Sequence, residues 1–246
     1  MKALVVSDVH GNADALTAVL EDAGPCDELW SLGDVVGYGA EPLECVELIT
    51  AFDGVLHAVS GNHDLAALGR LPLADFIPAG REAIEWTIPR LGETELAWLD
   101  RPPSLAVEPR TKLWHAGPID PVWGYLSSIG MAAAAFETVW NAYGFFGHTH
   151  RPIIYFQWRD GGKTDRLVPR PGHRFSLNDF GRRVLLNPGS VGQPRDGDAR
   201  AAYAIVDMDD GWIEWRRAEY PVEECREKIL AAGLPAVLAD RLAHGL

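Results

Sequence analysis

Five short polar strings along the chain consist of residue types that bind metal ions. In chain order they are Asp8-Val9-His10, Gly33-Asp34, Gly61-Asn62-His63-Asp64, His115-Ala116-Gly117 and Gly147-His148-Thr149-His150. Carboxylates, imidazoles and one amide oxygen suit divalent ions such as Mn²⁺, Fe²⁺ or Zn²⁺, and the absence of cysteine among them argues against a structural zinc site. The strings together therefore predict a centre for two metal ions.

Some of these residues also have a structural interpretation. Asn62 and Asp64 could cap a helix after the third string, and His63 could be a hydrogen-bonded histidine of the same turn. In a strand, His148 and His150 would face the same side because side chains alternate. The combination of five strings, rather than any single string, favours the metal centre.

Each string follows an apolar run that is typical of a buried strand, so the fold must gather the ends of these runs. Three repeats of strand, polar loop and helix indicate parallel strands. Helical patterns cover residues 71–103, 130–141 and 221–246, the last of them interrupted at Gly233-Leu234-Pro235. The predicted strands are Ala3–Val6, Leu29–Leu32, Val55–Val59, Leu105–Val107, Lys112–Trp114, Tyr143–Phe146, Ile153–Trp158, Val184–Leu186, Ala202–Asp207 and Trp212–Arg216.

Size and composition are those of one compact domain over residues 1–246. Hydrophobic residues make up 47% of the 246 positions, and no stretch has the composition of a linker. Cys26, Cys45 and Cys225 are odd in number and lack metal-binding spacing, which favours free thiols in a reducing compartment. With no leader pattern and no apolar run near the roughly 20 residues of a membrane span, we expect a soluble cytoplasmic protein.

The formal net charge of −13 argues against general binding to nucleic acid or anionic lipid, both of which need a basic surface. Residues 151–200 differ, with ten Lys and Arg against five Asp and Glu. This segment is either a solvated loop region or a border of the metal cleft that attracts an anionic substrate.

The five strings, in this order, resemble the signature of the calcineurin-like metallophosphoesterase superfamily, especially its compact bacterial and archaeal phosphodiesterases. The resemblance runs from Asp8 to Gly192 and is most specific at Gly-Asn-His-Asp and Gly-His-Thr-His. With the order of elements it predicts an α/β fold, a four-layer α/β/β/α sandwich with two mixed sheets flanked by helices. It also implies two divalent metal ions, with Mn first and Fe, Zn or Ni as alternatives.

The resemblance assigns roles to individual residues. The first ion would be held by Asp8, His10, Asp34 and His150. The second would be held by Asp34, Asn62, His115 and His148, with Asp34 bridging. Two cations about 4 Å apart would activate a bridging hydroxide for in-line attack on phosphorus. His63, oriented by Asp64, would give a proton to the departing oxygen.

Departures from the family pattern bear on the substrate. Many relatives that act on phosphoproteins or diadenosine tetraphosphate have Gly-Asp-x-Val-Asp-Arg-Gly where this chain has Gly33-Asp34-Val35-Val36-Gly37-Tyr38-Gly39, so the arginine that grips phosphate there is missing. His115 precedes Ala116, whereas His-Gly is the more frequent pair in the family. We expect this difference to change the local shape of the site and not to remove the ligand. Residues 187–195 resemble a rigid loop of the compact phosphodiesterases, on which Arg195 would grip a phosphate or pair with Asp196 or Asp198.

The leading hypothesis is a phosphodiesterase acting on a small or nucleotide-like substrate. Tyr38, Trp123 and Tyr125 are candidates to stack on a planar group, with packing as the alternative. A phosphomonoesterase or a dinucleoside polyphosphate hydrolase is the alternative enzyme, and a protein-binding scaffold is the alternative without catalysis. Residues 117–141 are interpreted as a cap, a contact in a homo-oligomer or core.

Overall fold

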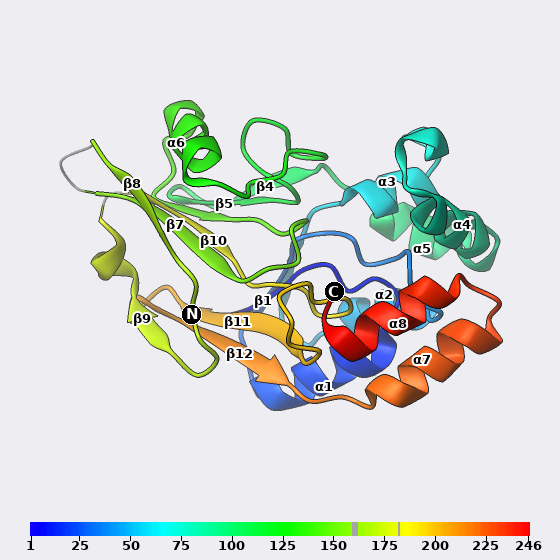
Figure 1. The fold of residues 1–246 in the computed structure, drawn as a ribbon. Coiled ribbons are helices and arrows are strands. Elements are labelled where there is room, and N and C mark those ends of the chain that lie inside the picture. Colours follow the sequence, from blue (N-terminus) through cyan, green and yellow to red (C-terminus); the bar gives the residue numbers. More distant parts are fainter. Residues whose placement is uncertain (159–161, 182) are drawn as a thin grey trace.

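Two six-stranded mixed sheets form the centre of the molecule in the computed structural model, which describes residues 1–158, 162–181 and 183–246 (Figure 1). The first sheet has parallel strands β1, β2 and β3 on one side and antiparallel pairings of β11, β12 and β9 on the other. In spatial order its strands are β3 (Val55–Ala58), β2 (Glu28–Ser31), β1 (Lys2–Val6), β11 (Ala201–Asp207), β12 (Trp212–Ala218) and β9 (Arg174–Ser176).

The second sheet has a parallel centre of β5, β6 and β10 with antiparallel strands at both edges. Its order is β4 (Ser104–Glu108), β5 (Thr111–Trp114), β6 (Tyr143–Phe145), β10 (Arg183–Asn187), β7 (Ile153–Gln157) and β8 (Thr164–Leu167). The prediction of two mixed sheets flanked by helices is confirmed.

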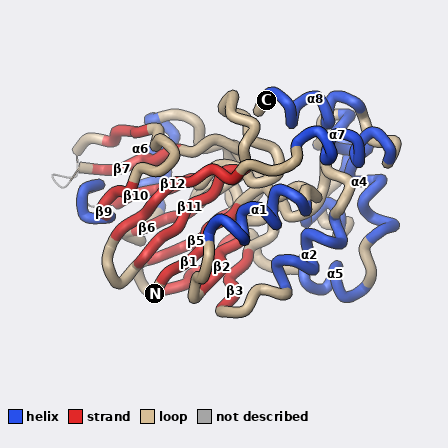
Figure 2. The backbone as a smooth tube through the Cα atoms, turned by 90° about the horizontal axis from the view of Figure 1, so that it is seen from below, coloured by secondary structure: helices blue, strands red, loops and turns tan. Residues whose placement is uncertain are grey.

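Helices cover the outer faces of the two sheets and gather at one end (Figures 1 and 2). The α-helices are α1 (Ala13–Ala23), α2 (Pro42–Thr50), α3 (Asn62–Ala67), α4 (Pro78–Thr87), α5 (Glu93–Leu99), α6 (Ile129–Thr138), α7 (Val222–Ala231) and α8 (Ala236–His244). Short 3₁₀ turns lie at η1 (Leu73–Asp75), η2 (Ile88–Arg90) and η3 (Leu177–Phe180). No helix in the described part of the chain is long and apolar enough to cross a membrane.

The alternation of side chains along the strands produces the layers. On β1, Leu4 and Val6 join the core beneath α1 and α2, whereas Ala3 and Val5 join the core between the sheets. On β5, Leu113 faces the core between the sheets and Trp114 packs on the far side with α6. A strand buried on both faces reads as a continuous apolar run, which is why the sequence revealed these central strands.

Strands β8 and β9 were not predicted. Both lie at a sheet edge, where one side of the strand is unpaired, and neither carries the apolar alternation of a half-buried strand. Their pairing with β7 and β12 compensates for their weak local preference.

The carboxyl ends of the parallel strands of both sheets lead into the five polar strings. The loops after β1 and β2, and helix α3 after β3, come from the first sheet. The loops after β5 and β6 come from the second sheet, and the loop after β10 joins them through a hydrogen bond from Val191 N to Ser7 O. The predicted ligands are therefore assembled between the two sheets.

Candidate metal centre

The loops of the centre hold the backbone in an unusual conformation. All non-glycine residues with positive φ in the described chain lie in these loops, namely Asp8, His10, Asp34, Tyr38, His148 and His150, with φ between 50° and 61°. Side chains make this left-handed region costly by about 1 to 3 kcal/mol per residue, so the surrounding structure must impose it. His148 and His150 lie in the turn after β6 and not in a strand, so strand alternation does not determine how they face.

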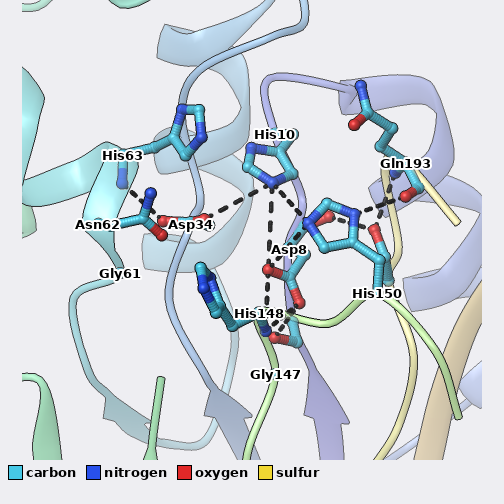
Figure 3. Close-up of polar contacts among 12 residues, drawn as sticks. Asp8, His10, Asp34, Gly61, Asn62, His63, Gly147, His148, His150 and Gln193 are labelled. Carbon is cyan, nitrogen blue, oxygen red and sulfur yellow. Dashed lines mark hydrogen bonds and ion pairs between the residues drawn. The ribbon is translucent and has the colours of Figure 1, made fainter. Parts of the chain in front are cut away.

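The first group of ligand atoms comes from Asp8, His10 and His150, all within 4.8 Å of one another. Nε2 of His10 and Nε2 of His150 are 3.2 Å apart. Oδ1 of Asp8 lies 3.4 Å from Nε2 of His150 and 4.0 Å from Nε2 of His10. Figure 3 shows these side chains converging on one point.

The second group comes from Asp34, His115 and His148, again within 4.8 Å. Nε2 of His115 lies 3.2 Å from Nδ1 of His148 and 3.1 Å from Oδ1 of Asn62. Asp34 lies between the two groups, since its Oδ2 is 3.5 Å from Nε2 of His115 and 3.6 Å from Nε2 of His10. All seven predicted ligands are thus brought together.

Backbone carbonyls fix the tautomer of three imidazoles. Nδ1 of His10 lies 3.2 Å from Val36 O, and Nδ1 of His115 lies 2.9 Å from Leu32 O. Nδ1 of His150 lies 2.6 Å from the backbone oxygen of Gln193 (Figure 3). Because a carbonyl only accepts hydrogen bonds, Nδ1 must carry the proton in each ring, and Nε2 presents a lone pair to the centre.

Facing lone pairs require a cation. The Nε2 lone pairs of His10 and His150 meet at 3.2 Å, and burial lowers the pKa of both rings well below its usual value, so neither ring supplies a proton between them. Nε2 of His115 faces the amide oxygen of Asn62. This donor set fits divalent metal ions.

The carboxylates show the same need for positive charge. Burial raises the pKa of Asp8 to about 7, and burial together with the Asp64 charge raises the pKa of Asp34. Burial also lowers the pKa of His148 to about 2. Burial thus disfavours the charged forms of Asp8, Asp34 and His148, and a bound cation would reverse this for both carboxylates.

Both carboxylates accept hydrogen bonds from the protein, and for Asp8 these reach both oxygens, since the backbone N–H of His148 also lies 3.2 Å from Oδ1. Oδ2 of Asp8 accepts hydrogen bonds from Ser7 Oγ at 2.6 Å and from the backbone N–H of His148 at 3.0 Å. Oδ1 of Asp34 accepts from the backbone N–H of His63 at 2.8 Å. A Cβ at Gly147 would meet Ser7 Oγ at 1.8 Å, so glycine is required there.

Asp64 does not orient His63, contrary to the prediction. Its carboxylate accepts hydrogen bonds from the backbone N–H groups of Asp34, Val35, Val36 and Gly61 at 2.8 to 3.2 Å. Asp64 thus fixes the loop that carries Asp34 and also caps α3, as the structural interpretation of this residue anticipated.

Packing, rather than a hydrogen bond on Nδ1, holds the His63 ring. Its Nδ1 is buried without a hydrogen-bond partner among the described residues. The ring contacts Tyr38 at 4.4 Å and Phe76 at 5.1 Å between centroids, and a Cβ at Gly37 would meet Nδ1 at 2.4 Å. Burial lowers the pKa of His63. The ring also forms a third candidate set with His10 and Asp34, so it lies beside the metal groups.

A cavity of about 290 Å³ opens over the centre, and we call it the reaction cavity. Tyr38 and Arg195, the two predicted substrate contacts, both line it. Its other lining residues are Asp34, Asn62, His63, Asp75, Phe76, Ile77, Trp123, Tyr125, His148, His150 and Arg241. Asp75, Phe76, Ile77 and Arg241 were missed, because they belong to none of the strings and no local pattern marks them.

Arg195 lines the reaction cavity and forms no ion pair with Asp196 or Asp198 in the described part of the chain. Its side chain donates to Oε1 of Gln193 at 2.9 Å, its Nε is buried without a partner in the described chain, and its guanidinium lies 5.8 Å from the centre of the Tyr38 ring. Asp196 pairs with Arg217, and Asp198 pairs with Arg200 at 2.7 Å.

The segment 117–141 divides into two parts. Its loop brings Trp123 and Tyr125 to the reaction cavity, where the Tyr125 ring lies 4.3 Å from that of His148. Its helix, α6, buries Ala135 and Phe136 against the second sheet. The core interpretation therefore fits the helix, and the loop borders the cleft.

Comparisons with known proteins agree with this geometry. The model of the calcineurin-like phosphoesterase superfamily domain matches residues 1–211. An uncharacterized protein of Methanocaldococcus jannaschii is 38% identical over 252 residues, covering 98% of this chain and 97% of that protein. A symmetrical bis(5'-nucleosyl)-tetraphosphatase of Baumannia cicadellinicola is 31% identical over 200 residues, covering 76% of this chain and 65% of that protein.

Two solved structures share the whole fold. The crystal structure of a metallophosphoesterase from Sphaerobacter thermophilus superposes with a TM-score of 0.87 at 38% identity, covering 100% of this chain and 99% of that one. A hypothetical protein from Pyrococcus horikoshii superposes with a TM-score of 0.79 at 19% identity, covering 100% and 98%, which shows a common fold. Helices α7 and α8 lie beyond the range of the family match, yet α8 supplies Arg241 to the reaction cavity.

Proposed function

Because this chain belongs to the calcineurin-like phosphoesterase superfamily, we propose that it is a phosphodiesterase that uses two divalent metal ions. The observation that carries the paired centre is the position of Asp34, whose Oδ2 lies 3.6 Å from His10 and 3.5 Å from His115. One carboxylate oxygen between two groups of imidazoles is the arrangement expected of a bridging carboxylate.

Two sets of residues would hold the ions. Asp8, His10, Asp34 and His150 would bind one, and Asp34, Asn62, His115 and His148 the other. Mn²⁺ is the first choice for these ligands, with Fe, Zn or Ni as alternatives. Bound metal ions would neutralise phosphate charge and activate water for attack on phosphorus.

The protein's own groups would position the substrate and supply a proton. Arg195 would donate to a phosphate oxygen, which is consistent with its unpartnered Nε at the cavity. His63 would give a proton to the departing oxygen, since its ring lines the cavity beside the metal groups, and the negative charge of a bound phosphate would oppose the lowering of its pKa by burial. The left-handed backbone at Tyr38 places the phenol ring between His10 and His63, 4.5 and 4.4 Å from their rings.

The lining of the reaction cavity supports a diester. Phe76, Trp123 and Tyr125 present aromatic surface to a substituent on the phosphate. Tyr38 lies in the string where many relatives have an arginine that grips phosphate, and it also lines the cavity. A monoester carries more negative charge and offers no second substituent to these rings. Hydrolysis of a dinucleoside polyphosphate is the second candidate, because relatives carry the name of a bis(5'-nucleosyl)-tetraphosphatase. We also propose that the protein acts in the cytoplasm.

The test is hydrolysis of bis(p-nitrophenyl) phosphate by metal-stripped protein resupplied with Mn²⁺, beside the variant His63→Ala. We expect the wild type to turn over with about two bound ions, and the variant to keep its metal while losing about 10²- to 10⁴-fold in kcat. Full metal occupancy without turnover would refute the diesterase assignment. Monoesters, dinucleoside polyphosphates and then a role in protein binding would be tested next.

A further inference from the structure

A second cavity, of about 540 Å³, adjoins the reaction cavity, and we call it the arginine cavity. Arg151, Arg166 and Arg195 line it, together with apolar side chains and the hydroxyl-bearing residues Ser127, Thr149 and Tyr155. The apolar lining residues are Leu126, Pro152, Ile153, Val168 and Leu246. Its volume is typical of a site for a small organic ligand.

The two cavities share one wall. Arg195 lines both of them. In the loop after β6, His148 and His150 line the reaction cavity, whereas Thr149 between them lines the arginine cavity. The neighbouring loop repeats the pattern, since Tyr125 lines the first cavity and Leu126 the second. A ligand that passes Arg195 would therefore reach from the metal centre into the arginine cavity.

The arginine cavity is positively charged in a protein whose formal net charge is −13. Its one acidic side chain, Asp196, is already paired with Arg217. Nε of Arg151 donates a hydrogen bond to the backbone oxygen of Arg195 at 2.7 Å, which holds together the wall between the two cavities. Arg166 forms no ion pair among the described residues. An anionic group is the ligand that such a site accepts.

A buried hydroxyl lies at the base of this cavity. Tyr155 is 0% exposed, and its hydroxyl oxygen lacks a hydrogen bond of sound geometry in the described structure. Arg166 faces this hydroxyl and opposes the rise in pKa that burial causes. Because the contact with Arg166 does not give this hydroxyl a hydrogen bond of good geometry, a phosphate or ribose oxygen beside it would improve its hydrogen bonding.

We propose that the arginine cavity binds a phosphate-bearing nucleoside, which is one end of a two-ended nucleotide substrate whose scissile phosphate lies at the metal centre. The three arginines would receive the additional phosphate, and the apolar side chains would contact the sugar and base. This inference rests on the proposed function, because it extends the substrate of the same centre. The proposal also gives a role to the excess of arginine in residues 151–200. Within that segment, residues 159–161 and 182 lie outside the described part of the structure.

The first experiment measures binding without catalysis. Calorimetry would follow adenosine monophosphate binding to metal-stripped protein, comparing the wild type with R166E and with the matched control R170E. Arg170 is exposed in the same segment and lines neither cavity. We expect R166E to weaken binding about tenfold and R170E to leave it within about twofold, since R166E removes a charged hydrogen-bond donor from the cavity and R170E does not. Equal affinity in both variants, or no binding to the wild type, would overturn the proposal.

The second experiment separates this proposal from the proposed function. With Mn²⁺ present, R166E should lower kcat/KM about tenfold for diadenosine tetraphosphate, which has additional phosphates, and leave bis(p-nitrophenyl) phosphate within about twofold. An equal loss on both substrates would show a general structural defect and contradict the arginine cavity. If the wild type hydrolyses neither substrate, the proposed function fails, and the calorimetry still decides whether the cavity binds a nucleotide.

Discussion

The floor and the rim of the reaction cavity are built by different means. Side chains of the floor are buried and tied to backbone groups, as in the bonds of His115 and His150 to carbonyl oxygens. The rim consists of half-buried or exposed groups such as Phe76 and Tyr125, which are held by ring contacts. A floor with fixed geometry suits bond-breaking chemistry, and a rim with few constraints suits selection among substrates.

The largest effect should follow from a change at the floor residue shared by both groups. We expect Asp34→Asn to lower kcat/KM by at least about 10³-fold, because both groups would lose the negative oxygen between them. The metal content, measured by plasma emission spectroscopy beside the rate, should be fewer than two ions per chain. Wild-type metal content and wild-type activity together would show that Asp34 is not the bridge.

A smaller loss should follow from Gly37→Ala, which acts on the ring beside the floor. The added Cβ would meet Nδ1 of His63 at 2.4 Å, at a backbone φ of 86° that disfavours alanine. The His63 ring must move, so kcat should fall about 10²-fold while the metal content stays at the wild-type value. Gly24→Ala is the control, because its φ is 63° and nothing lies within 4 Å of the added Cβ. An equal loss in both variants would indicate backbone strain alone.

Ser7→Ala should have an intermediate effect, since it removes a supporting bond of the floor and no ligand. Asp8 would lose the hydroxyl that donates to Oδ2 at 2.6 Å. We expect about a tenfold weaker affinity for Mn²⁺, the lower end of the range for such supporting groups, with kcat near wild type at saturating metal. Titration of the metal-stripped protein measures this. An unchanged affinity would mean that the backbone N–H of His148 is sufficient to hold Asp8.

The rim should give the smallest effect. Phe76→Ala removes one ring next to His63 and Trp123. KM for bis(p-nitrophenyl) phosphate should therefore rise about three- to tenfold, because the substrate loses one aromatic contact. The rate with methyl p-nitrophenyl phosphate, which has one ring fewer, should change less. Steady-state kinetics on the two substrates tests this. A kcat loss as large as that of Gly37→Ala would erase the distinction between rim and floor.

The same contrast explains how far the sequence could be interpreted. Floor residues stand in short strings directly after buried strands, so residue type, order and resemblance to a family were sufficient to name them. The sequence pattern could not predict the left-handed backbone at His148 and His150, because this conformation depends on contacts between loops. The role of Asp64 was misjudged for the same reason, since its hydrogen bonds cross from α3 to the loop after β2.

Rim residues could not be predicted in this way. Phe76 follows the short η1 turn, and Arg241 lies on α8, yet both reach the reaction cavity. The positions of these residues depend on how elements distant in the sequence pack together. No local sequence pattern indicates that packing. Trp123 and Tyr125 were named only as candidates, because aromatic residues are more often part of a core.

The pairing of β1 with β11 has a consequence for biosynthesis. Lys2 pairs with Asp207, so β1 is synthesised long before its neighbour in the sheet, β11. The loop that carries Arg195 and the Gln193 carbonyl is made just before it. A growing chain therefore presents Asp8 and His10 long before their partners exist, and such distant pairings form slowly. The metal-binding residues, together with the Gln193 carbonyl that holds His150, would therefore be complete only after β10 and the loop that follows it have been made.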